Sequence, residues 1–184
     1  MAVREVRLIG DPVLRTKAQE VTDFGPELKR LVSDMIDTMR DTRGVGLAAP
    51  QIGVELRVFV YEVDGETGHI INPVLENSEE QSEPLEEGRL SIPGLSYTVV
   101  RAYRTVAKGV NFDGEPIALV GNEFLSRVFQ HETDHLDGIL FIDRLELSDI
   151  RAPQAELNSS DFQNTVARIR RQRAASVGSA FGVS

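Results

Sequence analysis

The sequence contains no cysteine and no tryptophan, and it has only three histidines in 184 residues. The absence of cysteine excludes disulfides, thiolate nucleophiles and cysteine-ligated metal sites, and it fits a cytoplasmic protein. No apolar run approaches the ~18 residues of a membrane span, and the N-terminal segment lacks the apolar core of a signal peptide. The sequence therefore predicts no cysteine chemistry and no membrane partner.

Positive charge is also scarce, because 20 Lys and Arg residues face 29 Asp and Glu residues, for a net charge of −9. This balance argues against direct binding to nucleic acid. Hydrophobic residues make up 41% and charged residues 27% of the chain, as is typical of globular proteins. The length suits one compact domain. Because the composition changes near residue 148, we expect a main domain over residues 1–147 and a C-terminal helix and tail over residues 148–184.

Strands are expected near the N-terminus and through the middle of the chain. Their apolar patterns cover residues 3–8, 56–63, 70–75, 98–111 and 116–120. Asp113-Gly114 lies between the last two ranges and is a strong hairpin signal. The glutamate-rich residues 76–87 are interpreted as a solvated acidic loop or edge.

Three helices are expected from apolar residues at helical spacing and from capping residues. They run from Pro26 to residues 41–43, from Asn122 to Gly138, and onward from residues 159–161. Phe162, Val166 and Ile169 form the apolar side of the third helix. Residues 174–184 are expected to form a loose tail.

Residues 130–135 read QHETDH and carry the most informative pattern in the chain. His131 and His135 are four residues apart, so on a helix they project from one face and can bind one divalent ion. Glu132 is placed to take a proton from water and pass it to a leaving group. The alternative is two ordinary helix histidines beside a solvated acidic pair. His69, the third histidine, lies in a predicted strand and is interpreted as a surface residue.

Two further segments have unusual compositions. Residues 44–53 read GVGLAAPQIG, which is too small and apolar for a solvent loop. This segment offers backbone for a peptide to pair with, and Gln51 as a hydrogen-bond donor, although taken alone it fits a tight packing corner better. Residues 86–94 read EEGRLSIPG and predict a turn into a strand.

Together, these three segments resemble the motifs of peptide deformylases. The family patterns are Gly-x-Gly-Leu-Ala-Ala-x-Gln, Glu-Gly-Cys-Leu-Ser and Gln-His-Glu-x-Asp-His, and residues 10–15, GDPVLR, resemble the family's amino terminus. The resemblance covers roughly residues 5–146. It implies an α+β fold in which antiparallel strands surround a central helix that carries His131 and His135.

The resemblance also implies a function and a set of partners. It implies a metal-dependent hydrolase that removes the formyl group from the N-terminal formyl-methionine of nascent proteins. Its metal is usually Fe²⁺, with Zn²⁺, Ni²⁺ or Co²⁺ as substitutes. Its substrates are N-formylmethionyl peptides, ribosome-associated nascent chains among them. The backbone of Val45, Gly46 and Gly88 matches positions that pair with the substrate as an added strand.

The reactive groups that the resemblance implies lie in all three motifs. His131 and His135 match the histidine ligands of the metal, and Glu132 matches the general acid and base. Gln51 and the backbone N–H of Leu90 match the groups that stabilise the oxyanion when water attacks the formyl carbon.

At one position, however, the chain departs from the family pattern, because Arg89 stands where the family has its metal-binding cysteine. A guanidinium has no lone pair for a metal. A +1 group about 4 Å from a +2 ion would be repelled by roughly 8 kcal/mol at an effective dielectric of about 20. Three outcomes stay open. Arg89 turns outward and leaves a weaker metal with the histidines and water or Glu87; its guanidinium replaces the metal and pairs with Glu132; or the cleft serves another reaction or binding alone.

These outcomes lead to two functional predictions. The first is a peptide deformylase-type hydrolase acting on a linear amide. The second is a metal-free homologue, catalytically impaired or repurposed, that keeps the peptide-binding cleft. A zinc protease of the HExxH kind is a distant third, because nothing else in the sequence resembles that class.

Overall fold

The computed structural model describes residues 2–89, 92–144 and 155–179 of the 184-residue chain. The chain divides into two compact units, Met1–Arg144 and Leu145–Ser184. The predicted domain boundary between residues 147 and 148 stays a prediction.

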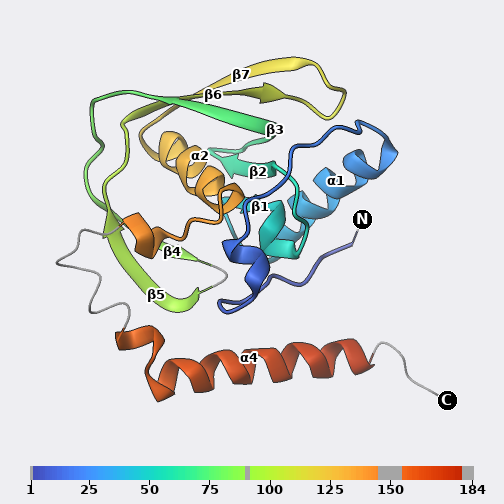
Figure 1. The fold of residues 1–184 in the computed structure, drawn as a ribbon, viewed down its shortest axis with the longest axis vertical. Coiled ribbons are helices and arrows are strands. Elements are labelled where there is room, and N and C mark those ends of the chain that lie inside the picture. The colour runs from blue at the N-terminus through green and yellow to red at the C-terminus, as the bar shows by residue number, and fades with distance from the viewer. Residues whose placement is uncertain (1, 90–91, 145–154, 180–184) are drawn as a thin grey trace. The chain divides into compact units, whose positions relative to one another are not determined.

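An antiparallel five-stranded sheet forms the centre of the first unit (Figure 1). In sheet order its strands are β1 (Gly46–Ala48), β2 (Val58–Val63), β3 (Glu66–Asn77), β6 (Arg104–Val110) and β7 (Pro116–Asn122). The hairpin predicted at Asp113-Gly114 connects β6 to β7, and Gly114 takes the left-handed φ of 81° that such turns require. β1 is one of the two edge strands of this sheet, and among the described strands it pairs with β2 alone.

Alternating side chains of β2 build two cores, one on each face of the sheet. Val58 and Val60 pack against the helix α1 (Pro26–Asp41), whose Met35 is fully buried. Phe59 points to the other face and contacts Phe129, with ring centroids 5.9 Å apart. This period of two is what an extended strand dictates. It places the sheet between α1 and the helix α2 (Glu123–Leu136).

The predicted bounds of both helices hold in the structure. Pro26 occupies the first turn of α1, as its fixed φ favours. Asn122 precedes α2 with extended backbone, and Gly138 follows it with a φ of 70°. The mixed α+β architecture predicted from the sequence is therefore present.

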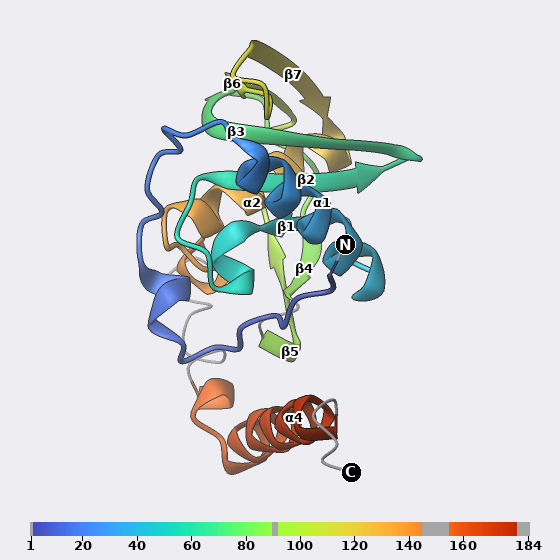
Figure 2. The ribbon, with the colours of Figure 1, turned by 90° about the vertical axis from the view of Figure 1, so that its right-hand side faces the viewer.

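A separate two-stranded sheet lies below the main sheet in Figures 1 and 2 and consists of β4 (Leu85–Arg89) and β5 (Ile92–Val99). The prediction of one strand over residues 98–111 is wrong, because β5 ends at Val99 and β6 begins at Arg104. Residues 100–103 carry the chain from one sheet to the other. The prediction of a solvated loop is wrong for Glu87, which lies in β4 and is only 5% exposed.

The strand predicted over residues 3–8 is also absent. Instead, the Arg4 N–H donates to Thr38 Oγ1 at 2.9 Å and the Arg4 guanidinium pairs with Asp34, both on α1, whereas the Arg7 N–H donates to the Gln51 carbonyl at 2.7 Å. A helix surface offers side chains and no strand edge, so the segment cannot join a sheet there. His69 differs from its prediction as well, because it is half-buried in β3.

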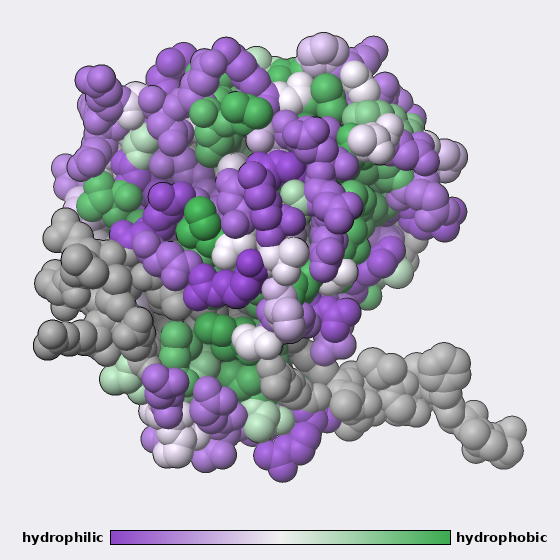
Figure 3. Space-filling view, viewed as in Figure 1, coloured by the Kyte–Doolittle hydropathy of each residue, from purple (hydrophilic) through white to green (hydrophobic). Residues whose placement is uncertain are grey.

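The second unit contains the helix α4 (Ser160–Ser179). The predicted cap is present, since Ser159 Oγ accepts the Phe162 N–H at 3.2 Å. The tail prediction is wrong for residues 174–179, which are helical, and two alanines at 174 and 175 favour that outcome. Residues 180–184 lie outside the described part of the chain. No described helix is long and apolar enough to cross a membrane, and the face in Figure 3 shows hydrophilic residues interspersed with small apolar patches.

Candidate active site

A cavity of about 310 Å³ opens between β1, β4 and α2. Five of the residues singled out in the sequence line it together: Val45, Gly46, Gln51, His131 and Glu132. They come from segments up to 87 positions apart, and the fold brings them into one cleft. These five predicted residues therefore lie close together in space, whatever role each of them plays.

The two histidines project from the same side of α2. The ring centroids of His131 and His135 lie 5.2 Å apart, with 67° between the ring planes. His135 is fully buried, whereas the His131 side chain keeps 14% of its surface exposed at the cleft. One helical turn separates the two residues, which is why a single ion can reach both.

Glu132 lies against β1, and the missing side chain of Gly46 makes this approach possible. A Cβ atom added at Gly46 would meet Glu132 Oε1 at 2.4 Å and the rest of its carboxylate end within 3 Å. Glu132 is 4% exposed. Gly46 therefore determines how close the carboxylate comes to the strand edge.

Gln51 lies in a short 3-10 helix, Ala49–Ile52, directly after β1. Its Oε1 accepts the Ala48 N–H at 2.7 Å, and the side chain is buried. Since the amide oxygen is engaged, the Nε2 group is the part of this side chain that remains to donate a hydrogen bond. Gln51 thus fits the donor role implied by its motif.

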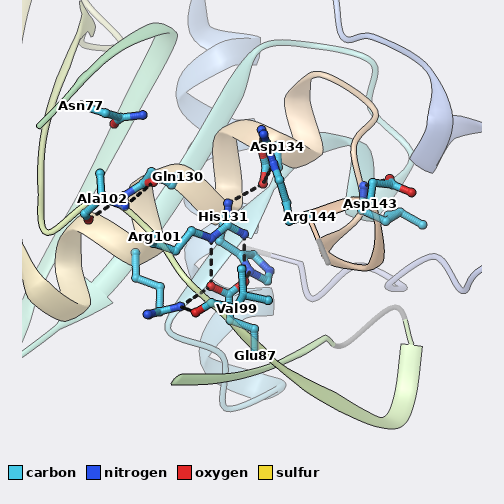
Figure 4. Close-up of polar contacts among 12 residues, drawn as sticks. Asn77, Glu87, Val99, Arg101, Ala102, Gln130, His131, Asp134, Asp143 and Arg144 are labelled. Atoms are coloured by element: carbon cyan, nitrogen blue, oxygen red, sulfur yellow. Dashed lines mark hydrogen bonds and ion pairs between the residues drawn. The ribbon is translucent and has the colours of Figure 1, made fainter. Parts of the chain in front are cut away.

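The Glu87 carboxylate is the centre of a buried polar network that the sequence did not reveal (Figure 4). It accepts hydrogen bonds from Arg101 Nε and Nη2, both at 2.9 Å, and from Arg127 Nη1 at 2.8 Å. His131 Nδ1 lies 2.9 Å from Glu87 Oε2. No motif contains Arg101 or Arg127, and no local spacing points to them. Because two guanidinium groups and an imidazole engage Glu87, the suggestion that it replaces the missing metal ligand is not supported.

Electrostatics fix the protonation of this network. Burial by itself would raise the pKa of Glu87, but the hydrogen bonds from Arg101 and His131 outweigh it and hold that pKa well below its usual range. The carboxylate is therefore ionised at neutral pH and can only accept hydrogen bonds. In this contact His131 Nδ1 therefore donates to Glu87 Oε2.

Arg101 continues the network to Asp134 on α2. Arg101 Nη1 donates to Asp134 Oδ2 at 2.6 Å, and Arg144 pairs with the same carboxylate. Burial alone would lower the pKa of Arg101, but its bonds to Glu87 and Asp134 raise the pKa above its usual value. Each buried charge is therefore matched by an opposite one, as buried ions require.

Two side chains of this site, His131 and His135, are suitable ligands for one divalent metal. A histidine that donates its second ring N–H to a carboxylate is the usual arrangement of a metal-ligating imidazole, and His131 has it. Catalytic metal sites commonly use three protein ligands. Among the described residues, however, no three His, Cys, Asp or Glu side chains form a metal-binding group. Within the described part of the chain, the donors that fit a divalent metal are therefore the two imidazoles.

The remaining predicted site residues lie on or next to β4. Gly88 pairs with Ser96, and the Arg89 backbone pairs with Ile92 after a register shift. Leu90 lies outside the described residues, so its expected role as an oxyanion donor stays a prediction.

Comparison with known proteins supports the assignment suggested by the motifs. The family model described as polypeptide deformylase matches residues 3–151. The chain is 56% identical to a peptide deformylase of Acidothermus cellulolyticus over 170 residues, which cover 92% of this chain and 94% of the relative. It is 53% identical to one from Parafrankia sp. over 165 residues, which cover 89% and 90%.

Solved structures agree. A peptide deformylase from Legionella pneumophila is 40% identical, with a TM-score of 0.81 over 91% of this chain and 99% of its own. One from Thermus thermophilus is 44% identical, with a TM-score of 0.79 over 89% and 99%. The predicted family and α+β fold are thereby confirmed, and this chain belongs to the polypeptide deformylase family.

Proposed function

We propose that this chain is a peptide deformylase, a hydrolase that releases formate from the N-terminal formyl-methionine of newly made proteins. The observation that carries the proposal is the cleft in which a member of this family brings together His131, Glu132 and Gln51, with the His135 ring 5.2 Å from that of His131. The family relationship favours this hydrolase over the metal-free alternative.

The substrate peptide binds as an added strand between β1 and β4. β1 is an edge strand, so the backbone of Gly46, and of Val45 directly before it, can pair with an extended peptide. Gly88 offers backbone on the opposite side. Phe124 and Val128 add apolar surface to the cavity, which suits the thioether side chain of methionine.

His131 and His135 would hold the divalent metal, for which we propose Fe²⁺, with Zn²⁺, Ni²⁺ or Co²⁺ as substitutes. When bound, the metal supplies Lewis-acid activation of water and of the formyl oxygen. Glu132 takes the proton from the attacking water and delivers it to the amide nitrogen as the C–N bond breaks. The products are formate and a free amino terminus. Gln51 Nε2 and the Leu90 N–H stabilise the oxyanion formed at the formyl carbon.

Arg89 weakens metal binding in this scheme without abolishing it. It contributes no lone pair and adds a positive charge next to Gly88 in β4. The Glu132 carboxylate lines the cavity, and its charge offsets part of the repulsion. We therefore expect a metal that is retained less well than in a site with three protein ligands.

Formate release from a formyl-methionyl tripeptide tests the function. The protein is loaded anaerobically with Fe²⁺ or Ni²⁺, and its metal content is measured in the same sample. Glu132→Gln is the control, because it removes the proton carrier and keeps a side chain of the same size. Turnover by the metal-loaded protein, lowered about 10²–10⁴-fold in the control, supports the proposal. No turnover at full metal occupancy would refute it.

We also propose that the enzyme works in the cytoplasm on chains emerging from ribosomes, because N-terminal formyl groups occur on newly made chains. The net charge of −9 argues against direct contact with nucleic acid. Co-sedimentation with ribosomes that carry a stalled formylated chain, compared with the same chain after deformylation, tests this location. Equal sedimentation with both would contradict recognition of the formylated terminus.

A further inference from the structure

Arg101 lies outside every motif, in the segment that connects β5 to β6. Its side chain is 4% exposed, and it does not line the active cleft. Even so, its Nε, Nη1 and Nη2 groups all donate to carboxylates on other segments of the chain. A guanidinium buried so deeply and bonded so fully is a feature that requires an explanation.

The first carboxylate is Glu87, and the contact is a fork. Two parallel N–H···O bonds of 2.9 Å join Arg101 Nε and Nη2 to the two oxygens of Glu87. A bidentate pair of this kind fixes the plane of the carboxylate as well as its distance. Glu87 Oε2, which accepts from Nη2, is also the atom that contacts His131 Nδ1. The direction of the imidazole thus depends on the guanidinium one contact away.

The second carboxylate is Asp134, which lies between the two histidines in sequence. It follows His131 by three positions and directly precedes His135, and it accepts from Arg101 Nη1 at 2.6 Å. Arg101 therefore joins β4 to the turn of α2 that carries both imidazoles, as Figure 4 shows.

The neighbouring guanidiniums do not make the same connection. Arg127 donates a single hydrogen bond to Glu87. Its other hydrogen bonds go to Ser82, Glu83 and Val99. Arg144 reaches Asp134 but not Glu87, and its side chain is 47% exposed. Among the described residues, Arg101 alone bridges both carboxylates.

We propose that Arg101 is a positioning residue of the metal site: it holds Glu87 in the plane that directs Nε2 of His131 toward the ion. The inference rests on the proposed function. Without the fork, Glu87 and His131 rotate, and the metal leaves faster while the fold persists. Loss of a partner that supports a metal ligand typically costs about 10–100-fold in metal affinity or activity.

Arg101→Lys tests the proposal, because it keeps a buried positive charge and removes the fork. Protein loaded with Ni²⁺ is mixed with excess chelator, and the rate of Ni²⁺ release is followed by absorbance. We expect release about 10–100-fold faster than in the unaltered chain, with kcat lowered by a similar factor and KM little changed. Arg144→Gln is the matched control and should stay within about twofold. Release unchanged in Arg101→Lys overturns the proposal.

A double-variant cycle distinguishes positioning from a general structural role. If Arg101 acts through Glu87, then Ni²⁺ release from the double variant Arg101→Lys, Glu87→Gln should be hardly faster than release from Glu87→Gln alone. Effects that multiply would overturn the inference. Should Arg101→Lys not fold, the neutral pair Arg101→Gln with Asp134→Asn keeps the buried charges balanced. Fast release in that pair supports the proposal, and unaltered release overturns it.

Ni²⁺ release needs no substrate, so this test is independent of the deformylase assay. Faster release from Arg101→Lys, combined with no formate from any metal-loaded sample, would retain the positioning role and refute the proposed function. Formate release by the metal-loaded protein, combined with Ni²⁺ release from Arg101→Lys at the rate of the unaltered chain, would support the proposed function and refute the positioning role.

Discussion

His131 and His69 show how two environments give one side chain different chemistry. His131 lies on α2 at the cleft, with its Nδ1 against the buried carboxylate of Glu87. His69 lies in β3, where its ring stacks on Phe112 at a centroid distance of 4.6 Å and 7° between planes. The Phe112 N–H donates to His69 Nε2 at 3.1 Å.

The partner decides what each imidazole can do. The ionised carboxylate of Glu87 can only accept from His131 Nδ1, so under the proposed function Nε2 is the ring nitrogen that would bind the metal. A backbone N–H uses the Nε2 lone pair of His69, so this ring serves as an acceptor that holds the β6–β7 turn. The comparison suggests that one histidine is functional and the other structural, and the following variants test that division.

The largest expected difference is in activity. His131→Ala should lower kcat/KM by more than about 100-fold, since the loss of a mere supporting partner already costs 10–100-fold. His69→Ala should keep activity within about twofold after correction for folded protein. The measurement is formate release at matched metal load, with circular dichroism to verify folding. Equal losses in both variants would remove the distinction.

A second variant introduces a metal ligand at the proposed metal site and leaves the surroundings of His69 unchanged. Arg89→Cys removes a positive charge and supplies a thiolate ligand, so we expect about tenfold or greater gains in metal retention and turnover. Arg89→Ser separates the two causes, because it removes the charge without adding a thiolate. Metal content after dialysis against chelator gives the answer. If Arg89→Cys retains no more metal than the unaltered chain, then the third ligand position is not limiting.

Substitution of two glycines, Gly46 at the cleft and Gly114 in the β6–β7 turn next to His69, should affect different properties of the protein. Gly46→Ala forces a methyl group against Glu132, so we expect kcat to fall about tenfold or more, in line with the 10²–10⁴-fold value of acid–base catalysis. Gly114→Ala, in the β6–β7 turn that also contains Phe112, meets no atom closer than 3.6 Å but has a φ of 81°. It should cost about 1–2 kcal/mol of stability and leave kcat unchanged. Chemical denaturation and initial rates, measured on both variants, check this contrast.

The smallest effect concerns pH. Burial lowers the pKa of His69, although Asp113 opposes part of that shift. The folded-state pKa therefore lies below the unfolded value of about 6.5. Its stability contribution is complete above that value and is lost as pH falls through the folded pKa.

Thermal melts of the metal-free protein between pH 7.5 and pH 5 measure this contribution. His69→Gln keeps an acceptor for the Phe112 N–H and does not titrate. We expect the unaltered chain to lose about 1–2 °C more in Tm than this variant over the range. Parallel curves would show that protonation of His69 has no energetic consequence.

The sequence predicted the elements whose signals are local. Pro26, Asn122 and Gly138 correctly placed the two main helices, because caps and φ restrictions act within one turn. Asp113-Gly114 correctly placed the β6–β7 hairpin. Errors arose where a non-local partner decided the outcome. In the segment of residues 3–8, Arg4 binds to α1 and Arg7 binds to Gln51, and residues 100–103 carry the chain from one sheet to the other.

The site divides in the same way. The helical period placed His131 and His135 on one face, and small residues in the 44–53 segment allowed the close approach of Glu132. The Glu87–Arg101–Asp134 network had no sequence signal, because its members meet only after β4, the β5–β6 connection and α2 have packed together.

The sequence alone thus determined which side chains can bind a metal, move a proton or donate to an oxyanion, since composition and short spacing set those capacities. It also determined, through Arg89 and the absence of cysteine, that no thiolate completes the site. Only the tertiary structure decided which imidazole points into the cleft and which carboxylate supports it. The physical reason is that burial makes an unpaired charge costly, so the fold must bring opposite charges from distant segments together.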